Sequence, residues 1–166
     1  DRVHATDWAF TLLNLKGCQL LYVCLYLTGG RVDSLANSDK IMQLATLLKM
    51  VRTKFIVAAD WNCTPDELAS SGIPGRLNGK IVVPTGANYS CSSGSRRLID
   101  YLVVGNGAAD VILSVSFDFH SPWKPHFGIL IQLISNIRQA VVQTCAKAKA
   151  LPLGVNVTNL HWQATR

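Results

Sequence analysis

The sequence predicts a mixed α/β domain of the α+β type, in which helices flank a partly antiparallel sheet. Short apolar, β-prone runs outnumber the helical patterns, and the two do not alternate regularly. The 166-residue length suits one domain, and 49% hydrophobic and 16% charged residues are typical of globular proteins. No stretch reaches the ~18 uncharged apolar residues that a membrane-spanning helix needs. We therefore expect a soluble chain with no membrane partner.

The first predicted elements are a hairpin and a helix. Residues 8–15 and 19–28 are two apolar, β-prone runs separated by the turn signal Lys16-Gly17. Between residues 38 and 51 apolar side chains recur at helical spacing, with Ser38 suited to the helix N-terminus. This order predicts a hairpin followed by an amphipathic helix.

Shorter elements follow. Thr64, then Pro65 and Glu67, form the pattern of a capping box with proline in the first helical turn, which predicts a short helix. That helix is expected to stop by Gly72, because glycine and proline are then too dense for regular structure. A basic helix is expected at residues 136–150. Further strands are expected at 54–59, 80–84, 98–104, 110–117 and 127–134, with a loop at 85–97.

Four polar side chains stand at the ends or edges of these apolar strands. Asp60 and Asn62 follow one strand, Asp100 lies inside another apolar run, and His126 directly precedes a third. A carboxylate inside a β-run is disfavoured by strand propensity and by the cost of burying charge, so it needs a partner. For any one of the four positions taken alone, a strand-end or edge residue that faces water is as good an explanation as a functional role. All four together favour an active site.

The segments around these residues resemble motifs of the endonuclease/exonuclease/phosphatase family, whose members have the DNase I-like fold. Val57-Ala58-Ala59-Asp60-Trp61-Asn62 resembles the family's strand followed by Gly-Asp-aromatic-Asn. Ser95 through Tyr101 resembles its Ser-x-x-x-Asp-Tyr element, and Pro125-His126-Phe127-Gly128-Ile129-Leu130 occupies the place of its Ser-Asp-His and following strand. The run that ends at Tyr26 resembles a strand with a phosphate-contacting tyrosine. The resemblance implies the second, C-terminal half of a four-layer α/β sandwich.

The resemblance also implies a metal-dependent phosphodiesterase with Mg²⁺ or Mn²⁺ as cofactor. Asp60 would orient or deprotonate the attacking water, and Asn62 would hold the phosphate or the water. Asp100 would bind one ring nitrogen of His126, fixing its tautomer and favouring the imidazolium. No metal ligand is assigned within this sequence. The residues expected to contact the substrate are Tyr26, Trp61 and Ser95.

Departures from the family pattern leave open whether the chain is an enzyme. The family's N-terminal half, which brings an Asn and the Glu that is the principal magnesium ligand, has no counterpart in this sequence. Pro125 stands where the family has an Asp before the catalytic His, so another carboxylate is lost. Ala59 replaces a glycine, which matters only if the backbone there needs positive φ.

Three functions therefore remain open. The net charge of +6 favours polyanions such as nucleic acid. The first function is a nuclease-type phosphodiesterase, active if another segment or chain supplies the metal-binding Glu. The second is a catalytically inactive remnant, derived for example from a retroelement endonuclease. The third is a basic nucleic-acid-binding module that needs no magnesium.

The expected organisation is a partial domain over residues 1–134 and a basic helix with a tail over 135–166. Half of a two-sheet sandwich exposes the inner face of its sheet, which the helix at 136–150, a homodimer or the missing N-terminal half would cover. The five cysteines form neither a zinc-spaced pair nor a complete disulfide set, and no targeting signal is visible. An intracellular location, nuclear or cytoplasmic, is expected.

Overall fold

The computed structural model describes residues 7–15, 17–122 and 124–134. Within these ranges it has the predicted mixed sheet with flanking helices. The expected helix at 136–150 and the tail at 135–166 lie outside the described residues. In chain order the elements are β1 (Trp8–Leu15), β2 (Cys18–Tyr26), α1 (Leu35–Val51), β3 (Lys54–Asp60), α2 (Pro65–Ser70), α3 (Ile73–Arg76), β4 (Gly79–Val82), β5 (Asp100–Gly105), a 3₁₀ turn (Ala109–Val111), β6 (Ile112–Asp118) and β7 (Gly128–Leu133).

The larger sheet has the strand order β1-β2-β3-β5-β4. β1 and β2 form the predicted antiparallel hairpin. β2 and β3 run parallel, which requires a crossover, and α1 provides it. β5 then pairs antiparallel with β3 and β4, in a register that places Asp60 opposite Asp100. Two carboxylates that are distant in sequence therefore meet at one end of the sheet.

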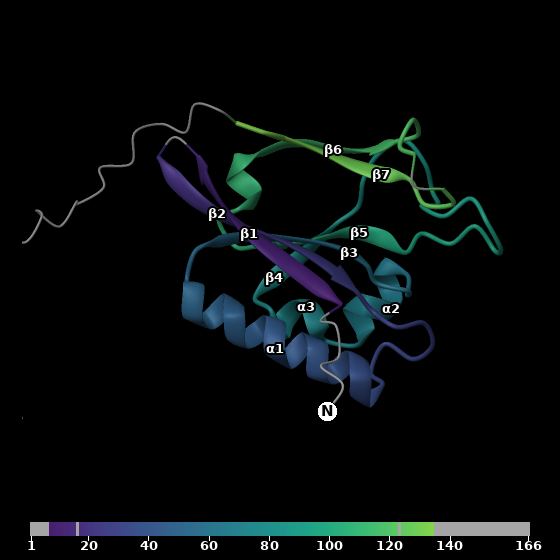
Figure 1. Cartoon of the computed structure of the whole chain (residues 1–166), viewed down its shortest axis with the longest axis horizontal. Coiled ribbons are helices and arrows are strands. Elements are labelled where there is room, and N and C mark those ends of the chain that lie inside the picture. The colour runs from purple at the N-terminus through teal and green to yellow at the C-terminus, as the bar shows by residue number, and fades with distance from the viewer. Residues whose placement is uncertain (1–6, 16, 123, 135–166) are drawn as a thin grey trace, which may run out of the picture.

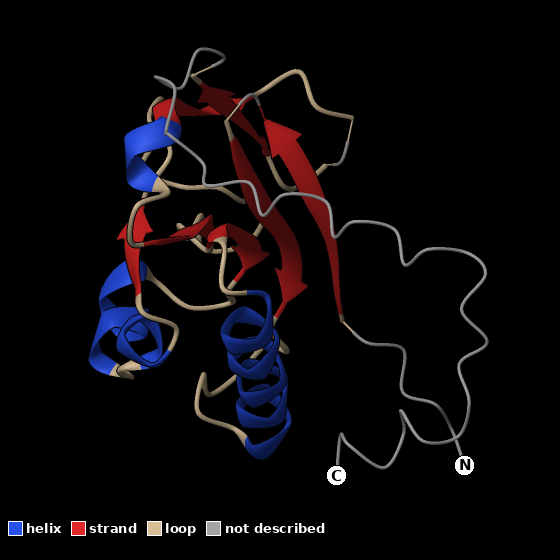
Figure 2. Cartoon of the chain, turned by 90° about the vertical axis from the view of Figure 1, so that its left-hand side faces the viewer, coloured by secondary structure: helices blue, strands red, loops and turns tan. Residues whose placement is uncertain are grey.

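The sheet lies between two different layers, which Figure 1 shows below and above it and Figure 2 shows from the side. Helices α1, α2 and α3 cover one face, and the antiparallel pair β6–β7 covers part of the other. Side chains alternate between the faces along each strand, so Val57 packs on the helical side and Ile56 on the β6–β7 side. Each face thus has its own apolar core. The pair β6–β7 already shields part of the inner face that the sequence left open.

Helix α1 begins earlier than the sequence pattern predicts. Its N-cap is Ser34, whose hydroxyl accepts a hydrogen bond from the Asn37 backbone N–H. The predicted start at Ser38 is therefore wrong. The buried Asn37 side chain accepts from the Thr28 N–H and donates to the Thr28 carbonyl, which ties the end of the β2 segment to the first turn of α1.

The segment after β3 confirms one prediction and corrects another. Thr64 caps α2 with the predicted capping box, in which its hydroxyl accepts from the Glu67 N–H and the Glu67 carboxylate accepts from the Thr64 N–H. α2 ends at Ser70 and so stops before Gly72, as expected. The expectation that regular structure does not follow is wrong, because α3 begins at Ile73. Pro74 lies in the first turn of α3, where proline has no hydrogen bond to lose. No helix in the described part of the chain is long and apolar enough to cross a membrane.

Candidate active site

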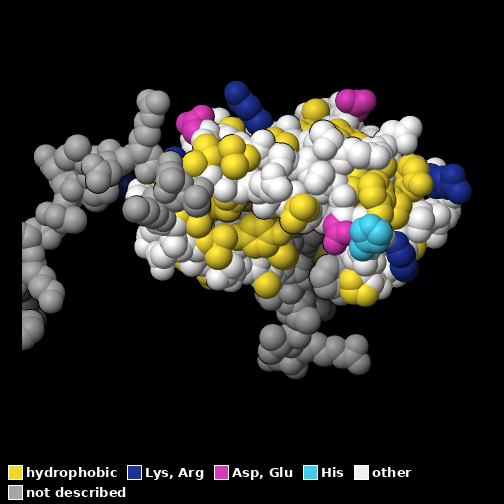
Figure 3. Space-filling view, turned by 90° about the horizontal axis from the view of Figure 1, so that it is seen from above, with side chains coloured by type: hydrophobic (Ala, Val, Ile, Leu, Met, Phe, Trp, Pro, Cys, Tyr) yellow, Lys and Arg dark blue, Asp and Glu magenta, His cyan; other side chains and the backbone are white. Residues whose placement is uncertain are grey.

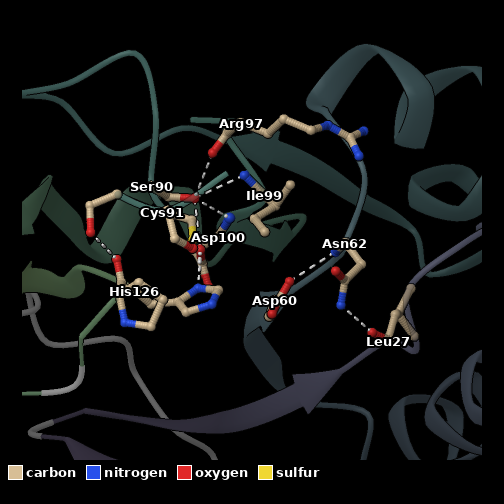
Figure 4. Close-up of polar contacts among 12 residues, drawn as sticks. Leu27, Asp60, Asn62, Ser90, Cys91, Arg97, Ile99, Asp100 and His126 are labelled. Carbon is tan, nitrogen blue, oxygen red and sulfur yellow. Dashed lines mark hydrogen bonds and ion pairs between the residues drawn. The ribbon is translucent and has the colours of Figure 1, made fainter. Parts of the chain in front are cut away.

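Three of the predicted catalytic side chains meet at the end of the larger sheet (Figure 4). Asp60 ends β3, Asp100 begins β5, and His126 comes shortly before β7. His126 Nδ1 lies 2.9 Å from Asp100 Oδ2, which is the predicted pairing. Asp60, Asp100 and His126 each offer a ligand atom, and these atoms lie within 4.8 Å of one another. The fold therefore joins an acid–imidazole pair with a second carboxylate.

Ser90 holds Asp100 in place, and the sequence analysis did not identify it. Its fully buried hydroxyl accepts hydrogen bonds from the backbone N–H groups of Ile99 and Asp100, both at 2.8 Å. The same hydroxyl donates to Asp100 Oδ2 at 2.7 Å. Figure 4 shows Ser90 next to Asp100, on the side away from His126. Ser90 lies ten residues before Asp100 in a serine-rich loop, so no local pattern distinguishes it from its neighbours.

The backbone around His126 is tied to the loop that contains Ser90. Cys91 and His126 form an antiparallel bridge, and the Phe127 N–H donates to the Ser90 carbonyl at 2.9 Å. The Pro125 carbonyl accepts from both the N–H and the hydroxyl of Ser92, each at 2.9 Å. Pro125 thus supplies no carboxylate but helps to fix the position of His126.

Asn62 joins the ends of two strands. Its backbone N–H donates to Asp60 Oδ1 at 3.0 Å, and its Nδ2 donates to the Leu27 carbonyl at 2.6 Å. Its φ of 51° lies in the left-handed region, which asparagine tolerates better than most residues. These contacts orient the Asp60 carboxylate. The expected contact of Asn62 with phosphate or water stays a prediction.

The environment of Asp60 makes its carboxylate a better proton acceptor than an exposed one. Burial raises the pKa of Asp60, and the nearby Asp100 charge raises it further. The Asn62 N–H and His126 act in the opposite direction and lower this pKa, but burial is the larger cause. A raised carboxyl pKa suits a group that takes a proton during a reaction near neutral pH.

The residues expected to contact the substrate have three different environments. Trp61 is only 1% exposed, its Nε1 donates to the Tyr101 carbonyl, and its ring stacks on Tyr101. Strand alternation turns it to the face opposite Asp60, so the expectation of substrate contact is wrong for Trp61. Tyr26 is 47% exposed and pairs with Asp60 in the β2–β3 register, which places it beside the site. Ser95 is exposed and has no hydrogen bond to the site among the described residues.

The cluster fits a divalent cation, although the sequence analysis assigned no metal ligand. Carboxylate oxygens suit Mg²⁺ and Mn²⁺, whereas an imidazole suits softer metals better. Asp100 Oδ2 is already engaged by Ser90 and His126, so Asp60 is the freer ligand. Three donor atoms are fewer than the six of an octahedral site, which leaves positions for water and phosphate.

Comparisons with known proteins identify the fold. No protein-family model matches the chain, and no curated protein matches its sequence. The endonuclease domain of TRAS1, a telomere-specific non-LTR retrotransposon, aligns with a TM-score of 0.62 at 12% identity, over 76% of this chain and 63% of that one. The chain has the DNase I-like fold. The 3'-5' exonuclease NExo from Neisseria meningitidis aligns with a TM-score of 0.53 at 17% identity, over 76% of this chain and 70% of that one.

The likeness covers only part of the DNase I-like fold. Cytolethal distending toxin from Actinobacillus actinomycetemcomitans aligns with a TM-score of 0.52 at 14% identity, over 75% of this chain and 52% of that one. This chain spans less than two thirds of the toxin chain and of the TRAS1 domain. The predicted fold class, including its correspondence to part of a larger sandwich, is confirmed.

Proposed function

We propose that this chain belongs to a divalent-metal-dependent phosphodiesterase that hydrolyses nucleic acid. The observation that carries the proposal is the 2.9 Å contact between Asp100 and His126 with the Asp60 carboxylate beside it. These groups lie at the end of the sheet in a DNase I-like fold. The net charge of +6 favours a polyanionic substrate. TRAS1 and NExo, which share the fold, are described as an endonuclease and an exonuclease.

Each side chain has a chemical role in this proposal. Phosphodiester hydrolysis needs an activated water and positive charge near the phosphate oxygens. Asp60, with its raised pKa, orients the water and accepts its proton. Asp100 accepts a hydrogen bond from His126 Nδ1, so in the imidazolium form the other ring nitrogen also carries a proton, which it can donate to a phosphate oxygen. Asp100 thus orients the imidazole without itself taking the proton.

A divalent cation would be held by Asp60, with the Asp100 carboxylate as the neighbouring donor. Bound there, Mg²⁺ or Mn²⁺ would neutralise charge on the phosphate oxygens. Further ligands would come from the portion of the fold that TRAS1 has beyond the 63% matched here. Association with that portion, or with a second copy of the chain, stays a prediction.

The test is hydrolysis of a plasmid and of a simple phosphodiester by the purified chain with Mg²⁺ or Mn²⁺. Cleavage should be lost in His126→Ala and retained in the matched control His120→Ala. His120 is exposed, and it is its backbone N–H, not its ring, that donates a hydrogen bond to Asp118. Equal cleavage by His126→Ala and the unaltered chain would refute the proposed active site.

Nucleic-acid binding without hydrolysis is the second candidate, and Pro125 favours it. Proline offers no carboxylate at this position, so the site has one potential metal contact fewer than the family pattern. This candidate predicts salt-sensitive binding to DNA or RNA that does not need magnesium. Absence of cleavage by the unaltered chain together with such binding would support it.

A further inference from the structure

An aromatic cluster formed by Tyr89, Phe117, Phe119 and Phe127 lies directly beside the proposed active site. Phe127 follows His126 and Tyr89 precedes Ser90 in the chain, so two of the rings are covalent neighbours of site residues. The Phe119 and Phe127 ring centroids are 4.9 Å apart, and the other ring pairs in contact are 5.4 to 6.5 Å apart. The cluster therefore joins the loop at 85–97 to the β6–β7 connection.

Two exposed cations lie over this cluster. The Arg96 guanidinium carbon is 5.6 Å from the Tyr89 ring centroid, and Lys124 Nζ is 5.5 Å from the Phe127 centroid. Lys124 Nζ also donates to the Phe119 carbonyl at 3.0 Å, which fixes it near the turn. Figure 3 shows this face, with hydrophobic side chains, lysine or arginine side chains, and an adjoining acidic and histidine pair close together toward its right-hand end.

The exposure of the rings is uneven. Phe117 is 6% exposed and packs as a core residue, whereas Phe119 is 44% exposed at the start of the β6–β7 connection. Packing of the two loops accounts for the buried Phe117 but not for the exposed ring of Phe119. Arg96 also has a φ of 49°, a left-handed conformation that favours glycine, so its backbone bears strain at this position.

We propose that the aromatic cluster, with Arg96 and Lys124, binds an unpaired nucleobase and its flanking phosphates next to the site of cleavage. This inference rests on the proposed function in taking nucleic acid as the ligand. Aromatic rings stack on bases of any sequence, and adjacent cations bind the phosphates on either side. In a regular duplex both faces of each base are covered by neighbouring bases, so only an unstacked base can reach Phe119.

The test compares binding of a single-stranded DNA oligonucleotide with binding of the blunt duplex of the same sequence. Fluorescence anisotropy is measured on the full chain with EDTA present, so the readout does not depend on hydrolysis. Phe119→Ala should weaken single-strand binding by roughly fivefold to a hundredfold, the range for loss of one stacked base, and should change duplex binding little. Phe119→Trp should retain single-strand binding, whereas Phe119→Leu, which keeps the apolar bulk but not the aromatic ring, should lose it.

Controls separate stacking from misfolding and from charge. Phe10→Ala removes another exposed ring, on β1, and should leave both affinities unchanged. Urea unfolding midpoints identify any variant that binds poorly because it is unfolded. Arg96→Gln should weaken binding of both DNA forms, because a phosphate contact is insensitive to pairing. Together these variants assign the preference for unpaired bases to the Phe119 ring.

The outcomes distinguish this inference from the proposed function. Unchanged single-strand affinity in folded Phe119→Ala would overturn the inference, even if the chain hydrolyses DNA. Retained affinity in Phe119→Leu would equally overturn it, because apolar bulk would then be sufficient. Loss of single-strand binding in Phe119→Ala and Phe119→Leu, together with no cleavage by the unaltered chain, would support base binding by the cluster. That result would count only against the proposed nuclease activity.

Discussion

Replacing Ser90 by alanine tests the arrangement on which the proposed active site depends. The Ser90 hydroxyl accepts from two backbone N–H groups and donates to the Asp100 carboxylate, so it uses its full hydrogen-bonding capacity inside the protein. Alanine removes these three bonds together with the longer 3.5 Å contact to the Arg97 carbonyl, and leaves the N–H groups of Ile99 and Asp100 without this acceptor. Each unsatisfied buried group costs about 1–3 kcal/mol, and the bond to the carboxylate contributes about 1.5–3 kcal/mol.

Local rearrangement recovers part of this sum, so we expect Ser90→Ala to lower the free energy of unfolding by about 3 kcal/mol. The assay is urea unfolding followed by the fluorescence of buried Trp61. Ser95→Ala is the matched control, since Ser95 is exposed in the same loop, and it should change the stability by no more than about 0.5 kcal/mol. A loss of less than about 1 kcal/mol in Ser90→Ala would refute the role assigned to its hydroxyl.

Three further predictions concern residues around the site. Burial and the Asp100 charge raise the pKa of Asp60, so its ionised form destabilises the fold above the folded-state pKa and this effect vanishes below the ordinary aspartate pKa. In EDTA, Asp60→Asn should therefore raise the free energy of unfolding at neutral pH but not in acid, as measured by urea unfolding at both pH values. An equal change at the two pH values would contradict this prediction. Trp61→Ala should cost about 3–5 kcal/mol of unfolding free energy, because it empties a core site and removes a buried hydrogen bond, and a small loss by calorimetry would disprove its core role. Thr64→Ala should cost about 1 kcal/mol through loss of the α2 cap, and an unchanged urea midpoint would show that the cap is dispensable.

Much of the fold can be predicted from the sequence, because several of its elements depend only on local chemistry. The hairpin, the strand that ends at Asp60 and the capping box at Thr64 depend on neighbouring residues, so their patterns are visible in the chain. The same holds for Asp100 and His126, because a polar group at the edge of an apolar run stands out wherever it occurs. Sequence motifs are therefore sufficient to predict the acid–imidazole pair that the structure shows.

The tertiary structure decided which side chains lie beside that pair. Trp61 follows Asp60 directly, but the two-residue period of the strand and the helices packed on one face turn its ring into the core. Ser90 reaches Asp100 because the loop at 85–97 folds back on β5, and the Cys91–His126 bridge fixes the imidazole there. Such contacts depend on how distant segments pack, which no local pattern encodes. The sequence alone determined the reactive groups, and long-range packing determined their orientation and their neighbours.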